Sequence, residues 1–113
     1  MNIQIFGTKK CQDTRKAERF FKERGIKYQF VDMTEKGMSK GELTAVSQAN
    51  GGLDNLINPD AKDKATVTLL KYIAEEDRLG KLLENQQVIK TPVVRNGKQS
   101  TIGYQPDVWK KWE

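Results

Sequence analysis

Cys11 is the only cysteine of this 113-residue chain, and it lies in the sequence IFGTKKCQDTRKAERFF, residues 5–21. An apolar run precedes it and a basic amphipathic segment follows it. A cysteine reacts as its thiolate, and an ordinary thiol with a pKa of ~8.5 is mostly protonated at neutral pH. A position just ahead of a helix, with Lys10 before it and Arg15 after it, favours the anion. The pattern predicts a nucleophilic thiolate at Cys11, with Arg15 assisting.

The alternative for Cys11 is an inert, buried position, which single cysteines commonly occupy. Its polar and basic neighbours in the sequence weigh against that alternative. One cysteine cannot form a disulfide within the chain, and the sequence contains no histidine. The usual structural zinc sites and catalytic Ser-His or Cys-His pairs are therefore excluded, and we expect neither a bound metal nor a bound cofactor.

The composition is typical of a soluble globular protein, with 36% hydrophobic and 31% charged residues. The apolar runs are a few residues long, far short of the ~20 that cross a bilayer. Met1 is followed by NIQIF, which has neither the apolar core nor the cleavage site of a signal peptide. We therefore expect a cytoplasmic protein with no membrane partner.

The net charge of +5 comes from the two ends of the chain. Residues 1–40 carry +5 and residues 88–113 carry +3, whereas residues 41–87 carry −3. Such a surplus indicates either a solvated basic surface or a site for an anion near Cys11. Because no basic run is interleaved with aromatic residues, we do not expect direct binding to nucleic acid.

The first third of the chain predicts a β-α-β unit. Residues 2–6 alternate between polar and apolar and predict a strand. A helix capped by Asp13 or Thr14 is predicted to run to about Arg24, and residues 27–33 predict a second strand. Two strands joined by one helix are expected to be parallel, with a right-handed crossover.

The middle of the chain, about residues 37–87, predicts a block of short helices. SKGE at 39–42 matches a capping box, which predicts the start of one helix. Residues 53–59 predict a helical turn, and apolar stripes over 67–73 and 79–83 predict two further helices. We interpret this block as an insertion.

The end of the chain predicts a hairpin followed by a helix. Residues 93–95 and 98–102 are predicted strands around an Asn96-Gly97 turn. Pro106 suits the first turn of a closing helix. We expect three apolar residues of that helix to face the core: Val108, Trp109 and Trp112.

The predicted order is β-α-β, a helical insertion, then β-β-α. Without the insertion, this order is the thioredoxin arrangement. We therefore predict an α/β protein with a thioredoxin-like fold and a mixed central sheet. The whole chain, residues 1–113, is expected to form a single domain that contains the insertion.

Thr91-Pro92 is the second feature with functional meaning. A proline at the edge of a sheet is the ordinary interpretation. In a thioredoxin-type fold, however, this proline would be cis and would lie beside the helix-start cysteine. It would then present the backbone of Thr91 to a bound thiol compound or peptide. We expect the substrate to contact four residues: Lys10, Lys90, Thr91 and Pro92.

Several segments together resemble one family: GTKKCQDTRKA, GIKYQFVDM, LDNLIN, IKTPVV and IGY. They are similar to the arsenate reductase (ArsC) and Spx family, including its uncharacterised relatives that resemble glutathione-dependent reductases. The resemblance extends from residue 3 to about residue 112. It implies that Cys11 is the nucleophile and that Arg15 completes the C-x-x-x-R pattern of arsenate reductases.

The sequence departs from the family's patterns in two ways. Spx regulators carry C-x-x-C, but Thr14 holds the second position here, so an intramolecular redox switch is excluded. Arsenate reductases use further arginines, one in the insertion and one just before the cis proline. Here NPDAKDKAT at 58–66 contains no arginine, and Thr91 precedes the proline.

Three lysines offer positive charge in place of those arginines: Lys62, Lys64 and Lys90. Lysine cannot reproduce the planar, bidentate grip of arginine on an oxyanion. We therefore expect arsenate reduction itself to be inefficient.

The leading interpretation is a thiol-dependent reductase. The Cys11 thiolate would attack an oxidised or oxyanionic small substrate, while Arg15 and the helix amides hold negative charge. Because the chain supplies no resolving thiol of its own, we expect glutathione as co-substrate or a glutaredoxin-like partner to regenerate Cys11. The alternative is a regulatory protein resembling Spx, which binds RNA polymerase without turnover. A third interpretation is a binding module that has lost its chemistry.

Overall fold

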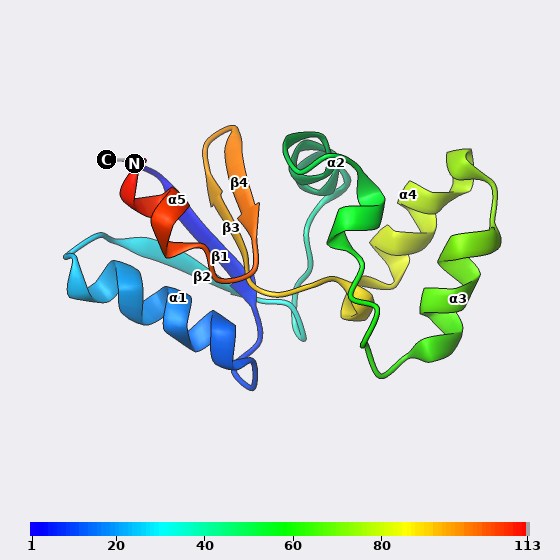
Figure 1. Ribbon diagram of the computed structural model, residues 1–113, viewed down its shortest axis with the longest axis horizontal. Coiled ribbons are helices and arrows are strands. Elements are labelled where there is room, and N and C mark those ends of the chain that lie inside the picture. The colour runs from blue at the N-terminus through cyan, green and yellow to red at the C-terminus, as the bar shows by residue number, and fades with distance from the viewer. Residues whose placement is uncertain (113) are drawn as a thin grey trace.

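In the computed structural model, which describes residues 1–112, a four-stranded sheet separates two groups of helices (Figure 1). The strands are β1 (Ile3–Gly7), β2 (Tyr28–Asp32), β3 (Val93–Asn96) and β4 (Gln99–Ile102). The helices are α1 (Gln12–Glu23), α2 (Lys40–Ala49), α3 (Lys64–Tyr72), α4 (Glu75–Glu84) and α5 (Pro106–Lys110). Short 3₁₀ turns lie at Leu53–Leu56 and Gln86–Val88.

The sheet is mixed, with the strand order β2-β1-β3-β4. β1 and β2 are parallel, and α1 connects them. β3 is antiparallel to β1, and β4 is antiparallel to β3. The predicted α/β class, element order and mixed central sheet are confirmed.

Helices cover both faces of the sheet. Because side chains alternate between the faces along a strand, one strand contributes to the core on each side. Ile3 and Ile5 of β1 pack with α1 and α5 in one apolar cluster, which includes Phe21 and Trp109. Phe6 points to the other face and packs with residues of the helical insertion. Figure 1 shows these two helical groups on opposite sides of the strands. β1 therefore lies between two cores, and its last residue leads directly into the cysteine loop.

Helix α1 starts two or three residues earlier than the sequence predicted. Its N-cap is Cys11 itself, with an extended backbone and no side-chain hydrogen bond to the helix. Asp13 and Thr14, the predicted caps, lie inside the first turn. The helix ends at Glu23, and Gly25 follows with a φ of 67°, a conformation that glycine adopts without strain. The earlier start places the sulfur at the helix N-terminus.

The helical insertion forms as predicted. Ser39 accepts a hydrogen bond from the Glu42 N–H, and the Glu42 carboxylate accepts one from the Ser39 N–H, which completes the capping box of α2. Helices α3 and α4 follow the 3₁₀ turn, and their apolar faces contribute Val67, Leu70 and Leu82 to the core. In Figure 1 they lie at the end of the molecule furthest from α1.

The C-terminal hairpin forms, but its turn is one residue later than predicted. Asn96 pairs with Gln99, so Gly97 and Lys98 are the turn residues. Asn96 also pairs with Ile3 of β1, and this contact keeps it in the strand. Gly97 has a φ of 61°, which explains why a glycine stands there.

The closing helix α5 begins at Pro106, as predicted. Trp109 is buried, and its indole N–H donates to the Thr101 hydroxyl at 2.8 Å. Trp112 packs against the same cluster, but Val108 is 39% exposed, so its predicted inward position is wrong. A helix of five residues presents one main face to the sheet, and Trp109 fills it.

None of the helices in residues 1–112 combines the length and the apolar character that a membrane crossing requires.

Candidate functional site around Cys11

The site is built on the loop that connects β1 to α1. Gly7 ends the strand, and the Cys11 N–H donates to the carbonyl oxygen of Thr8 at 3.2 Å, which closes the loop. The Cys11 carbonyl then accepts from the Arg15 N–H, also at 3.2 Å, as the first bond of the helix. The Cys11 side chain is half-buried. Backbone N–H groups of the first turn therefore lie next to an accessible sulfur.

Thr91 lies against the sulfur from the opposite side of the site. The Cys11 Sγ is 3.7 Å from the Thr91 carbonyl oxygen, to which the neutral thiol can donate. The Thr91–Pro92 peptide bond is cis, as predicted, and Pro92 is buried at the start of β3. Residues 80 positions apart in the sequence thus meet at the sulfur. The predicted juxtaposition of Cys11 with Thr91 is present, and the cis Pro92 follows Thr91 directly.

The pKa of Cys11 is below its ordinary value. Burial raises the pKa, but hydrogen bonds that the thiolate can accept from the Thr14 hydroxyl, the Thr91 side chain and the N–H groups of Thr14 and Asp13 together lower it by a larger amount. The direction agrees with the sequence-based expectation, and so does the contribution of N–H groups at the helix start, but the expected contribution of Lys10 and Arg15 is absent. Neutral hydrogen-bond donors, and no lysine or arginine, favour the thiolate.

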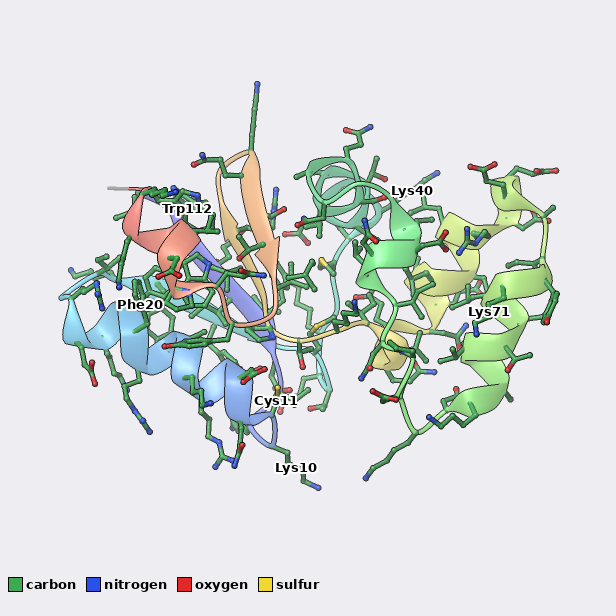
Figure 2. All side chains as sticks on the ribbon, in the orientation of Figure 1. Lys10, Cys11, Phe20, Lys40, Lys71 and Trp112 are labelled. Atoms are coloured by element: carbon green, nitrogen blue, oxygen red, sulfur yellow. The ribbon has the colours of Figure 1, made fainter. Side chains whose placement is uncertain are left out.

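Arg15 and Lys10 are both exposed. Lys10 extends from the tip of the loop away from the body of the protein (Figure 2). Arg15 makes no side-chain hydrogen bond or ion pair with any residue from 1 to 112. A bound anion could recruit the free Arg15 guanidinium, and its assisting role stays a prediction.

A groove of about 520 Å³ lies next to the cysteine loop, lined by neighbours of Cys11 but not by Cys11 itself. Thr8 and Thr91, both in contact with Cys11, line one part of it. The remaining lining residues come from the end of β2, from the insertion and from the segment before β3: Met33, Thr34, Asn58, Asp60, Ala61, Lys62, Asp63, Gln86, Gln87 and Ile89. The helical insertion therefore supplies most of the wall opposite the cysteine.

The groove carries more negative than positive charge. Lys62 is the one cation of its lining, and Asp60 and Asp63 are carboxylates. Hydrogen bonds from Thr66, at the start of α3, and from Gln87 hold the pKa of Asp63 below its usual range, so this carboxylate is ionised. The charges of the lining oppose the binding of a multiply charged anion.

Lys90 lies next to Thr91 in the sequence, but its side chain lines two other hollows. One of these also contains Asp54 and Arg78, an insertion arginine that the sequence analysis overlooked. The Arg78 guanidinium pairs with the Asp54 carboxylate and is not part of the groove beside Cys11. Neither side chain brings positive charge to the sulfur in this arrangement.

Sequence reasoning missed the importance of Thr14. It treated this residue as a helix cap or as the position of an absent cysteine, whereas the side chain is fully buried beside the Cys11 loop. The spacing of three residues could have indicated the contact, because positions i and i+3 share one face of a helix. What the sequence could not show is whether the hydroxyl has another partner.

Comparison with known proteins identifies the family. A model of the ArsC family matches residues 6–112. The chain belongs to the ArsC family. Spx 2, a global transcriptional regulator of Oceanobacillus iheyensis, is 27% identical to this ArsC-family chain over 109 residues, which cover 95% of the chain and 80% of the regulator.

Solved structures agree with the assignment of the fold. An arsenate reductase from Vibrio cholerae matches with a TM-score of 0.83 at 19% identity, over 98% of this chain and 97% of that one. The glutaredoxin-like NrdH-redoxin from Escherichia coli matches with a TM-score of 0.51 at 16% identity, over 100% of this chain and 96% of that one. The predicted thioredoxin-like fold and family are therefore confirmed, and these structural likenesses establish the fold alone.

Proposed function

We propose that this ArsC-family protein is a thiol-dependent oxidoreductase with Cys11 as its single nucleophile, regenerated by an external thiol such as glutathione. One observation carries the proposal: a half-buried sulfur at the start of α1 is surrounded by donors that favour its thiolate and lies beside a groove. Reactive cysteines occupy partly exposed positions of this kind, whereas structural ones are inert.

The reaction consists of two thiol–disulfide exchanges. The Cys11 thiolate attacks one sulfur of a small disulfide, forms a mixed disulfide with it and releases the other sulfur as a thiolate. The external thiolate then attacks the mixed disulfide, forms a new disulfide with the substrate's sulfur and releases Cys11 as the thiolate. Two exchanges restore the protein, and the external thiol supplies the reducing electrons.

The groove supports a small peptide-like thiol as the external reductant. Its volume of about 520 Å³ lies within the range of ~300–1,000 Å³ that small-molecule sites occupy. Lys62 offers a partner for a carboxylate, while the carboxylates of Asp60 and Asp63 offer partners for an ammonium group. Glutathione carries both kinds of charge on a peptide of matching size. A glutaredoxin-like protein is the other reductant that this chemistry permits.

The test is turnover of a small mixed disulfide in the presence of reduced glutathione, monitored by the appearance of the substrate's own thiol after it is separated from glutathione by chromatography. We expect turnover by the wild-type protein and none by Cys11→Ser. Lys36→Ser, which changes an exposed lysine that does not line the groove, is the matched control and should retain full activity. Equal background rates for the wild-type protein and Cys11→Ser would refute the proposal.

Arsenate is expected to be a poor substrate. Lys62 is the one cation that lines the groove, and two carboxylates line it as well. Thr91, which precedes the cis proline, brings no positive charge. A hydrogen bond to a charged group contributes about 1.5–3 kcal/mol, so two missing arginine contacts lower kcat/KM by about two to four orders of magnitude. The nucleophile itself is unaffected by this loss.

The substitution Thr91→Arg tests the oxyanion argument. We expect it to raise kcat/KM for arsenate by about one to two orders of magnitude, since it returns one charge-assisted contact. Thr34→Arg adds the same charge elsewhere in the groove and should have a smaller effect. Rapid arsenate reduction by the unmodified protein with a glutathione system would show that lysines hold the oxyanion.

A regulatory function is the second candidate, because Spx 2 is similar over nearly the whole chain. In this alternative the protein binds RNA polymerase and carries out no turnover. Immobilised protein incubated with purified RNA polymerase distinguishes the two. Retention of polymerase by both wild-type and Cys11→Ser protein, without thiol turnover, would favour the regulatory function.

A further inference from the structure

The Thr14 hydroxyl is a buried polar group without a partner. Its side chain has no exposed surface, and Oγ1 makes no hydrogen bond within residues 1–112. Buried side-chain polar atoms nearly always have a partner, so an exception needs a physical reason. Thr44 shows the ordinary solution for a helical threonine, because its hydroxyl donates to the Lys40 carbonyl oxygen at 2.8 Å. Thr14 does not adopt this solution.

Packing fixes where the Thr14 side chain lies. It covers Gly7 at the end of β1 so closely that a Cβ on that glycine would be 2.6 Å from the Thr14 Cγ2 and 3.0 Å from its Cβ. Thr14 therefore occupies the space that a side chain at position 7 would need. Thr14 also lies three residues after Cys11, in the first turn of the helix that Cys11 caps. The hydroxyl is thus held against the end of the strand, on the helical turn that Cys11 caps.

We propose that Thr14 is a positioning residue for Cys11, with its otherwise unpartnered hydroxyl donating to the sulfur and holding it as a thiolate that faces the groove. This inference rests on the proposed function, in which Cys11 is the nucleophile. A thiolate accepts hydrogen bonds strongly, whereas a neutral thiol sulfur is a weak acceptor. The buried hydroxyl therefore gains its partner when Cys11 loses its proton.

The electrostatic surroundings agree with this role. The Thr14 hydroxyl stands first among the hydrogen bonds that lower the pKa of Cys11. The charged residues on the elements packed around the sulfur are Lys9, Lys10, Asp13 and Arg15 on the loop and α1, Asp32 at the end of β2, and Asp60, Lys62 and Asp63 in the groove. None of their charges is among the causes that shift the Cys11 pKa. Hydrogen bonds are therefore the interactions that stabilise the Cys11 thiolate.

The same contact acts in both exchanges of the proposed reaction. In the first, it raises the fraction of Cys11 present as the attacking thiolate. In the second, Cys11 is the leaving group, and a leaving thiol of lower pKa departs faster. Thr14 therefore contributes to release as well as to attack, without providing a second sulfur.

The test measures the Cys11 pKa directly, without turnover. The thiolate absorbance near 240 nm is titrated against pH in reduced wild-type, Thr14→Val and Thr14→Ser proteins, with Cys11→Ser as the blank. Valine keeps the shape and removes the hydroxyl, so we expect the pKa to rise by about one to two units. Serine keeps the hydroxyl and should return the pKa to near the wild-type value. Thr44→Val, the matched helical control, should not change it.

Circular dichroism and urea unfolding establish that each variant is folded before it is titrated. If Thr14→Val does not fold, Thr14→Ala replaces it in the comparison with Thr14→Ser. An unchanged Cys11 pKa in the folded variant without the hydroxyl overturns the inference. A raised pKa in protein that shows no disulfide turnover would support Thr14 while refuting the proposed function, so the two failures are distinguishable.

Discussion

Gly7→Ala is predicted to destabilise the protein because the Thr14 side chain occupies the space that the new methyl group needs. A Cβ at Gly7 would be 2.6 Å from the Thr14 Cγ2 and also closer to Oγ1 than contact allows. Gly7 does not have a positive φ, so alanine suits its backbone and the collision alone decides the outcome. Both groups are buried, which leaves them little freedom to move apart.

The size of the effect follows from two opposing contributions. Overpacking of a buried site costs about 1–3 kcal/mol, and replacing a strand glycine by alanine regains about 0.5–1 kcal/mol. We expect a net loss of about 1–2 kcal/mol. Gly80→Ala is the matched control, because a Cβ at Gly80 in α4 meets nothing within 4 Å. Alanine there should gain about 1 kcal/mol from helix propensity.

Urea unfolding followed by tryptophan fluorescence measures both free energies, since Trp109 is buried. A difference of about 2–3 kcal/mol between the variants corresponds to a shift of roughly 1 M in the urea midpoint. Adding Thr14→Ala to Gly7→Ala removes the two closest atoms and should recover part of the loss. If Gly7→Ala is as stable as Gly80→Ala, the placement of Thr14 over Gly7 is refuted.

Further outcomes follow from the cysteine and the helix caps. Iodoacetamide should modify Cys11 with a pH midpoint below that of a free cysteine, because hydrogen bonds lower its pKa; a midpoint at or above that value would refute this. Because the pKa of Cys11 is lower in the folded than in the unfolded protein, the folded state binds fewer protons at pH values between these two pKa values. The free energy of unfolding of the wild-type protein should therefore rise with pH in that window, relative to that of Cys11→Ser. Free energies of unfolding that change with pH in the same way for both proteins would contradict this prediction. Oxidised glutathione should add one glutathione by intact mass and form no internal disulfide, whereas an unmodified mass would indicate an inert cysteine. Ser39→Ala should cost about 1 kcal/mol in urea unfolding, because it removes the capping box of α2; an unchanged midpoint would show that the box is unimportant.

The fold was predictable where local pattern and chain order decide it. Alternation gave the strands, capping residues gave the start of α2, and the order of elements gave the thioredoxin-like arrangement with its insertion. The hairpin turn was misplaced because its register depends on a distant strand. Asn96 pairs with Ile3 of β1, and its side-chain oxygen accepts from the Asn2 N–H at 3.2 Å. Contacts across 94 positions of sequence override the preference of Asn-Gly for a turn.

The site was predictable in position but not in its electrostatics. The sequence placed Cys11 at a helix start and near Thr91, and both are present. It assigned the stabilisation of the thiolate to the start of the helix, whose N–H groups do contribute, and also to Lys10 and Arg15 because they are close in sequence. Spacing along a chain does not fix the direction of a long, flexible side chain, and both of these are exposed. Short, buried side chains such as Thr14 have few conformations, so packing fixes their contacts.

The way in which the thiolate is held bears on which substrates the site can accept. Donors without net charge, from Thr14, Thr91 and the first turn of α1, leave the negative charge of the sulfur uncancelled. The groove beside it adds the carboxylates of Asp60 and Asp63 against the single ammonium of Lys62. A dianionic oxyanion would approach an anion through an acidic groove, and each like-charge contact opposes it. A neutral disulfide meets no such repulsion and gains the full nucleophilicity of the thiolate. The electrostatics of the groove, with no change in the nucleophile, therefore favour thiol–disulfide exchange over reduction of arsenate.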